Sequence, residues 1–450
     1  MTSPGAPPPA AASSGPPQSL RYAWYVVGVL TLVYVFSFID RQIFSVLVGP
    51  LRQYLHISDT KVSLLMGFSF ALFYMCFGIP IGRLADQYSR RWLIAMGLLL
   101  WSGFTAGCGL ASTYTQLLIL RMGVGVGEAA LSPAAYSLIT DYFPRERLAT
   151  AISVYATGIY IGMGLSYVLG GVVVGWAATQ PAWTLPLVGT TQPWQLIFFV
   201  IGLPGMALVP LLFTIREPRV RLGRTVAPLR EVLVYILENR RTFLLHNFGF
   251  ALISLAAYAT LGWVPEFYRR HFHWDIRTAG LVYGVIVSVG GVAGLIGAGR
   301  VADRVYAKGR QAAVFIVAAC IAGLLVPVNL LLFLAPSATW ATTWLVVQSV
   351  LFAAPFGMAP TAIQQMMPAN MRGQASAAYL LFSALIGLGI GPTAVALCTQ
   401  YIFGGDQGLP YSLALVTSLG CGLSAGMLWL ARGPFLASLE RFRVWGGAGA

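Results

Sequence analysis

The sequence predicts an all-α polytopic membrane protein with twelve transmembrane helices. Hydrophobic residues make up 57% of the 450 residues, charged residues make up 9%, and the mean hydropathy is +0.75. A soluble globular chain carries about a quarter charged residues, so a soluble fold is excluded. Apolar runs of about 20 residues recur along the chain, each long enough to cross a bilayer as a helix. The alternating segments of a membrane β-barrel are absent from the sequence.

The apolar runs place the spans at 22–47, 62–81, 92–111, 116–139, 149–176, 193–215, 242–265, 278–299, 311–334, 340–366, 373–400 and 411–432. Residues 1–20 are rich in Pro, Ala and Ser and carry no charge, which predicts a disordered tail and not a signal peptide. The long loop 216–241 separates two six-span halves, 21–215 and 242–432, and residues 433–450 form a second tail. Within this loop, Leu229–Leu237 has the pattern of an amphipathic helix on the membrane surface.

The basic residues predict that both termini are cytoplasmic. With the N-terminus inside, 21 of the 28 Lys and Arg residues fall in inner segments and five in outer loops; Arg41 and Arg121 lie within spans. Basic residues are enriched in cytoplasmic loops, so this excess sets the orientation, and the membrane is the inner (plasma) membrane if the cell is bacterial. The net charge of +14 therefore reflects topology and not a nucleic-acid-binding surface.

This orientation predicts a labelling pattern. A cysteine introduced near Arg230 should react with an impermeant thiol reagent only from the inside, and one near Gln192 only from the outside. The five native cysteines all fall within predicted spans, and their replacement removes any background reaction. Labelling of both introduced cysteines from the same side would show that the orientation is wrong.

Two loops repeat the same motif at equivalent places in the two halves. GRLADQYSRR (82–91) follows the second span and GRVADRVYAKGR (299–310) follows the eighth, which indicates a parallel duplication. Each loop combines a small residue, a carboxylate at a helix end and a following arginine. We expect a conformational latch that forms only when the halves are closed on the inner side; the alternative is a basic loop that only sets topology. In the first copy, Asp86 could lie beside Arg90 or Arg91 in this closed state.

Four charges lie well inside predicted spans: Asp40 and Arg41 in the first, and Arg121 and Glu128 in the fourth. Arg121 and Glu128 are seven residues apart and therefore share one helix face. If the first and fourth spans face each other, the four charges form one cluster. Charges at bilayer depth are costly and mark functional sites by default. Burial raises a carboxyl pKa and a nearby arginine lowers it, so Asp40 and Glu128 are candidates for carrying protons. Arg41 and Arg121 are candidates for binding an anionic substrate group; a purely structural ion pair is the alternative.

Other side chains have weaker signals. Tyr155, Tyr258 and Trp263 are candidates for lining a substrate cavity, although aromatic residues near span ends also serve as interfacial anchors. Glycines in the fifth, eighth and eleventh spans predict close helix packing. We predict no metal site, because the cysteines have no metal-ligand spacing. No cofactor is expected, and no phosphate-binding loop for ATP occurs.

Twelve spans, the six-plus-six duplication and the GRLAD and GRVAD loops together resemble the major facilitator superfamily. Two stretches resemble its spinster family of lipid transporters: FIDRQIFSVLVGPLRQYLHIS at the end of the first span, and RMGVGVGEAALSP with the residues that follow it. The family's Y-x-D-R element maps onto Asp40 with Arg41, and its R-x-x-x-G-x-G-E-A element onto Arg121 with Glu128. The superfamily's latch motif maps onto Gly82, Asp86 and Arg90, and its second copy onto Gly299, Asp303 and Arg304. The resemblance implies two six-helix bundles around a central cavity, proton coupling through the two carboxylates, and a polar cavity end at these charges.

The sequence departs from the family pattern at three positions. Phe38 stands where the Y-x-D-R element has tyrosine, and Gln87 and Ser89 replace the arginine and glycine of the first latch copy. The anion-transporting branch of the superfamily also carries D-R in span one and G-x-G-E in span four.

The expected function is proton-coupled secondary active transport of an amphipathic lipid, a lysophospholipid or a sphingosine phosphate-like molecule, by alternating access. We expect a monomer that meets membrane lipids, protons and its substrate, and neither an enzyme nor a nucleic-acid-binding protein. The alternative substrate is a small organic anion such as a sugar acid. A membrane sensor that does not transport would tolerate loss of the four buried charges.

Overall fold

The computed structural model describes residues 19–177, 179, 183–185, 189–217, 228–368 and 371–447. Among them, the chain is helical apart from one antiparallel hairpin, β1 (Trp183–Leu185) and β2 (Gly189–Thr191). Eleven helices of the described chain are long and apolar enough to cross a membrane. The helix α5 (Arg90–Cys108) adds a twelfth crossing, because its 19 residues extend about 28 Å. The predicted fold class is confirmed, and all but the last residues of the predicted N-terminal tail lie outside the described residues.

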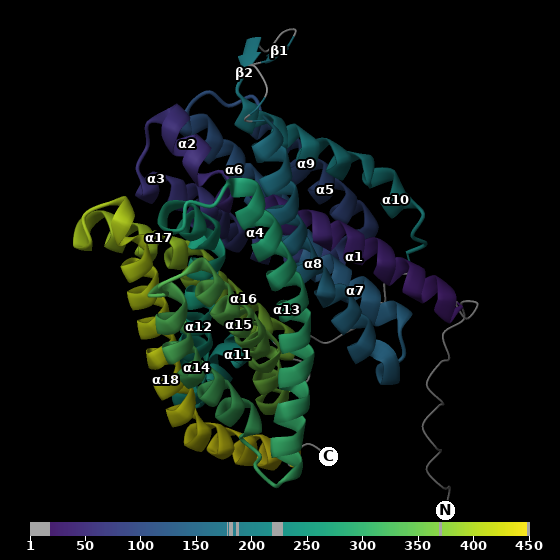
Figure 1. The fold of residues 1–450 in the computed structure, drawn as a ribbon. Coiled ribbons are helices and arrows are strands. Elements are labelled where there is room, and N and C mark those ends of the chain that lie inside the picture. The colour runs from purple at the N-terminus through teal and green to yellow at the C-terminus, as the bar shows by residue number, and fades with distance from the viewer. Residues whose placement is uncertain are drawn as a thin grey trace, which may run out of the picture.

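The first half comprises the elements up to α10 (Figure 1). In order they are α1 (Leu20–Gln42), η1 (Ile43–Ser45), α2 (Val48–Leu55), α3 (Asp59–Ser63), η2 (Leu64–Phe68), α4 (Ser69–Gln87), α5, α6 (Tyr114–Glu128), α7 (Leu131–Tyr142), α8 (Arg145–Ala177), η3 (Pro193–Gln195), α9 (Leu196–Ala207) and α10 (Val209–Phe213). Within this bundle α1 packs along α8, and α5 packs against α6 and α9.

The second half begins with a short helix in the connecting loop. The elements are α11 (Leu229–Glu238), α12 (Arg240–His271), α13 (Ile276–Ala307), α14 (Ala313–Phe333), α15 (Ala338–Met366), α16 (Arg372–Ala384), η4 (Leu385–Ile390), α17 (Gly391–Leu397), η5 (Cys398–Ile402), η6 (Asp406–Gly408) and α18 (Leu409–Gly447). Here α12 packs along α18, and α14 packs against α15 and α18 (Figure 1). The helix α11 covers the predicted amphipathic run: it exposes Leu229, Leu233 and Leu237 and buries Val232 and Tyr235.

Several spans predicted as continuous contain breaks or irregular turns. The first ends as an α-helix at Gln42 and continues in the 3-10 turn η1. The fourth breaks after Glu128, at Ala129, because Pro133, four residues beyond Ala129, has no N–H to donate to the Ala129 carbonyl. The eleventh contains the π-helical segments η4 and η5, and η2 in the second span is also π-helical. Such irregular turns occur often at functional sites.

The two halves meet along two seams. One runs between α8 and α13, and the other between η2 with α4 and η4 with α17. Each seam contains a glycine for which no larger residue fits. A Cβ at Gly67 in η2 would overlap the carbonyl oxygen of Leu388, and one at Gly164 in α8 would overlap the hydroxyl of Ser288. Glycine therefore sets how closely the helices of the two bundles approach.

Candidate functional site

An ion pair joins the first and fourth spans inside the first bundle. Arg41 lies in the last turn of α1, and Glu128 is the last residue of α6. The Arg41 Nη2 donates to Glu128 Oε2 at 2.6 Å, and the Ser37 hydroxyl donates to the same oxygen at 2.7 Å. Arg41 Nε and Glu128 Oε1 are buried and have no hydrogen-bond partner among the described residues. The pair is therefore held by one bond where a bidentate pair would have two.

Although Arg121 and Glu128 share a helix face, the structure does not pair them. Arg121 instead donates from all three guanidinium nitrogens to backbone carbonyls: Nε to Leu65 at 3.2 Å, Nη1 to Asp40 at 3.2 Å and Nη2 to Arg41 at 2.8 Å. The last four carbonyls of a helix lack partners within the helix, and α1 ends at Gln42. Arg121 therefore binds the end of α1 to the π-helical η2.

Asp40 is buried next to the Arg121 guanidinium. Its backbone carbonyl accepts from Arg121, while its side-chain Oδ1 has no partner within the described part of the chain. The cluster thus holds two carboxylates, Asp40 and Glu128, that each carry one buried oxygen without a hydrogen bond. A buried ionised oxygen left unpaired is costly. Both carboxylates therefore carry an oxygen whose burial is not compensated by a hydrogen bond within the described residues.

Aromatic rings surround the two arginines. The Arg41 guanidinium lies over the rings of Phe38, Phe70 and Tyr74, with centroid distances of 4.5, 4.7 and 5.4 Å. The Arg121 guanidinium lies over Phe44 and Phe70, both at 4.9 Å. Each ring face carries partial negative charge, so these contacts stabilise a cation that has few anionic partners.

The three aromatic residues predicted to line a cavity lie in different surroundings. Tyr155 is buried and stacks on Tyr34, with ring centroids 4.4 Å apart, and its hydroxyl has no hydrogen-bond partner within the described residues. Tyr258, in α12 of the second half, is half-buried and lies within electrostatic range of Arg41. Trp263 is fully buried, and its indole N–H donates to the Pro392 carbonyl at 2.9 Å. Of the three, Tyr258 brings the second bundle to the charged cluster.

The first predicted latch arginine, Arg90, lies in a buried network within its own bundle. Its Nη1 donates to Asp141 Oδ2 at 2.6 Å, and its Nε donates to Glu217 Oε1 at 3.2 Å. Burial raises the pKa of Glu217, but hydrogen bonds from Ser89 and Arg90 outweigh it, and the pKa lies below its ordinary value. Glu217 is therefore ionised at neutral pH. Neither of these carboxylates was singled out from the sequence.

The other latch residues remain predictions. The side chain of Asp86 lies outside the described residues. Gly82 and Gly299 have open space where a Cβ would stand, so neither marks a close contact here. Asp303 and Arg304 are both exposed.

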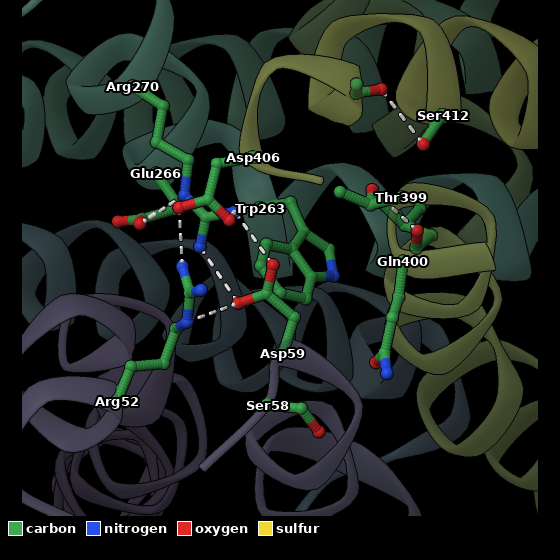
Figure 2. Close-up of polar contacts among 12 residues, drawn as sticks. Arg52, Ser58, Asp59, Trp263, Glu266, Arg270, Thr399, Gln400, Asp406 and Ser412 are labelled. Atoms are coloured by element: carbon green, nitrogen blue, oxygen red, sulfur yellow. Dashed lines mark hydrogen bonds and ion pairs between the residues drawn. The ribbon is translucent and has the colours of Figure 1, made fainter. Parts of the chain in front are cut away.

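A second charged site, which the sequence reasoning missed, joins the two halves at the predicted outer end. Four side chains form a closed ring of alternating charge, shown in Figure 2: Arg52, Asp59, Arg270 and Asp406. Arg270 binds Asp59 at 2.7 Å and Asp406 at 3.2 Å, and Arg52 binds Asp59 at 3.2 Å and Asp406 at 3.0 Å. We call this arrangement the ionic ring.

The ionic ring crosses the seam between the bundles. Arg52 and Asp59 belong to α2 and α3 of the first half, and Arg270 and Asp406 belong to α12 and η6 of the second. Glu266 extends it, accepting from Arg270 at 2.6 Å. A signal was present in the sequence, because three of the five basic residues left on the outer side, Arg52, Arg269 and Arg270, belong to this region. Their partners lie far away in the chain and only the fold brings them together.

The sequence matches the model of the Major Facilitator Superfamily over residues 30–392. An MFS-type efflux pump of Mycolicibacterium smegmatis is 28% identical over 415 residues, covering 91% of this chain and 93% of the relative. Protein spinster of Drosophila melanogaster is 28% identical over 269 residues, covering 59% of this chain and 42% of the relative. The probable L-galactonate transporter of Escherichia coli K12 is 26% identical over 426 residues, covering 89% of this chain and 87% of the relative.

The fold is also similar to that of a solved bacterial homologue of the human lysosomal transporter spinster, in an inward-facing and unoccupied conformation. The TM-score is 0.75 at 25% sequence identity, and the match covers 94% of this chain and 98% of that chain.

Proposed function

Since the chain belongs to the major facilitator superfamily and is a spinster-like membrane transporter, we propose that it couples proton movement to transport of an amphipathic lipid bearing a phosphate group. The lipid is a lysophospholipid or a sphingosine phosphate-like molecule. The observation that carries this proposal is the single-bonded Arg41–Glu128 pair, buried among aromatic rings, with an unpaired nitrogen and an unpaired oxygen.

The proposed mechanism is an exchange of partners at Arg41. A proton on Glu128 neutralises the carboxylate and releases the guanidinium, which then binds the phosphate of the substrate. Loss of the proton restores the carboxylate, which competes with the phosphate for Arg41. Protonation of Glu128 and binding of the anion at Arg41 therefore favour each other, and this reciprocity couples the two. Arg121 keeps its carbonyl partners throughout and holds the end of α1 in place.

Alternating access completes the cycle. The ionic ring holds the bundles together at the predicted outer end, as expected for a state open to the other side. The transporter reaches the opposite state when the ring breaks and the bundles rock about the α8–α13 seam. The likeness to an inward-facing spinster homologue supports this assignment.

Uptake into proteoliposomes tests the proposal. With an imposed pH gradient, purified protein should transport a short-chain lysophosphatidic acid or sphingosine 1-phosphate. Arg41→Ala should abolish this uptake, because the phosphate loses its buried cation. Arg277→Ala, which removes an exposed arginine at the start of α13, is the matched control and should retain it. Full uptake by Arg41→Ala would refute the proposed role of Arg41.

A sugar acid is the second candidate substrate. The similarity to the probable L-galactonate transporter, which extends over 89% of this chain, favours it. The same assay with radiolabelled galactonate separates the two substrates. Uptake of galactonate without uptake of either lipid would replace the lipid proposal and leave the role of Arg41 in binding an anion intact.

A further inference from the structure

One aromatic ring is shared by both buried arginines. The Phe70 ring centroid lies 4.7 Å from the Arg41 guanidinium carbon and 4.9 Å from that of Arg121. Phe70 is fully buried in the first turn of α4, two residues after the end of the π-helical η2. Neither the family resemblance nor the expected site includes this residue.

The two arginines depend on this ring to different extents. Arg121 has three carbonyl partners, which do not change when a carboxylate gains a proton. Arg41 pairs with Glu128 and interacts with the Tyr258 hydroxyl of the second bundle, and it otherwise contacts ring faces. When Glu128 is protonated, the aromatic faces and the Tyr258 hydroxyl supply the remaining attraction on the Arg41 cation. A desolvated cation–π contact contributes more than an exposed one, so burial strengthens the attraction of these rings for Arg41.

Phe38 and Phe70 constrain the Arg41 guanidinium relative to different parts of the structure. Phe38 lies one turn from Arg41 on the same helix and moves with it. Phe70 belongs to α4, so its ring positions the guanidinium relative to another helix. The preceding segment η2 also carries Gly67, which contacts the backbone of Leu388 in the second bundle. Phe70 thus relates the position of Arg41 to the seam between the bundles.

We propose that Phe70 is a positioning residue that holds the Arg41 guanidinium in place while Glu128 is protonated, so that an incoming anion meets a preorganised cation. This rests on the proposed function in one respect: Glu128 must release Arg41 during the cycle. The preorganisation lowers the cost of ordering a long side chain at the moment of binding.

The test replaces Phe70 with phenylalanines carrying one, two or three ring fluorines, which weaken the negative face of the ring at nearly constant shape. Thermal unfolding is measured in the wild-type and Glu128→Gln backgrounds. We expect the unfolding midpoint to fall stepwise with fluorine number, and more steeply in Glu128→Gln, where Arg41 has lost its carboxylate. The same series at Phe198, a buried phenylalanine with no cation over its ring among the described residues, is the control.

Transport provides a second measurement. Phe70→Leu should raise the KM for lysophosphatidic acid by about tenfold to thirtyfold, the equivalent of a desolvated cation–π contact. Phe70→Tyr keeps an aromatic face and should leave the KM near the wild-type value. Equal slopes in the two backgrounds, or equal fluorine effects at positions 70 and 198, would overturn the proposal. If wild-type protein transports no phosphate lipid, the proposed substrate is wrong, but the unfolding series still decides the role of Phe70.

Discussion

Replacing Glu128 with glutamine is expected to abolish uptake driven by a pH gradient while substrate exchange without a gradient persists. Glutamine has nearly the shape of protonated glutamic acid and keeps an oxygen that can accept from Ser37, so the fold survives, but the side chain cannot gain or lose a proton. The gradient-driven component should fall at least about tenfold, since a permanently neutral side chain no longer responds to proton concentration. The measurement is uptake and counterflow by purified Glu128→Gln protein in proteoliposomes, with and without the gradient.

Glu231→Gln is the matched control, because Glu231 is exposed on α11 and has no part in the cluster. A purely structural ion pair predicts a different outcome. Breaking a buried pair costs about 3–5 kcal/mol, so folding and expression would fall together with transport. Wild-type dependence on pH in well-folded Glu128→Gln protein would end the proton-carrying role of Glu128. Asp40 would then be the remaining buried carboxylate of the cluster.

Arg270→Gln is expected to open the predicted outer end. Arg270 binds Asp59, Glu266 and Asp406, so its loss removes an inter-bundle pair and one of the two arginines that pair with each of the buried carboxylates Asp59 and Glu266. Loss of one member of a buried pair costs about 3–5 kcal/mol. Because the inter-bundle pair exists only when the outer end is closed, this cost shifts the balance toward the outer-open state by about a hundredfold or more. Spin labels at Gln53 in α2 and Tyr411 in α18, both exposed, should move to longer distances.

The neighbouring residue provides the control. Arg269 pairs with Glu266 of its own helix. Its guanidinium lies against Gly49 of α2, but it makes no ion pair with the first bundle among the described residues, so Arg269→Gln removes an equal charge without breaking an inter-bundle ion pair. The label distances should stay as in the wild type. If the two substitutions change the distances equally, the effect is one of net charge at the outer surface, and the ionic ring is not a gate.

Several features follow from local sequence properties. Hydropathy and length identify the spans, because a helix must satisfy its own backbone hydrogen bonds in lipid and needs about 20 apolar residues to cross. The same rule makes Asp40, Arg41, Arg121 and Glu128 conspicuous, since each is a costly exception inside an apolar run. The repeated G-R-x-A-D loops reveal the duplication. These inferences do not depend on which helices are neighbours in the fold.

The partners of the buried charges were decided by tertiary structure. Arg121 and Glu128 share a helix face, yet Glu128 pairs with Arg41. The reason is that α1 ends at Gln42 and leaves carbonyls without helical partners, to which Arg121 donates its hydrogen bonds. The ionic ring depends on residues 52, 59, 270 and 406, which lie on four elements of two bundles. Hydropathy acts on each segment separately and therefore determines which helices form. Ion pairing depends on where helices break and which ends meet, and only the assembled fold determines that.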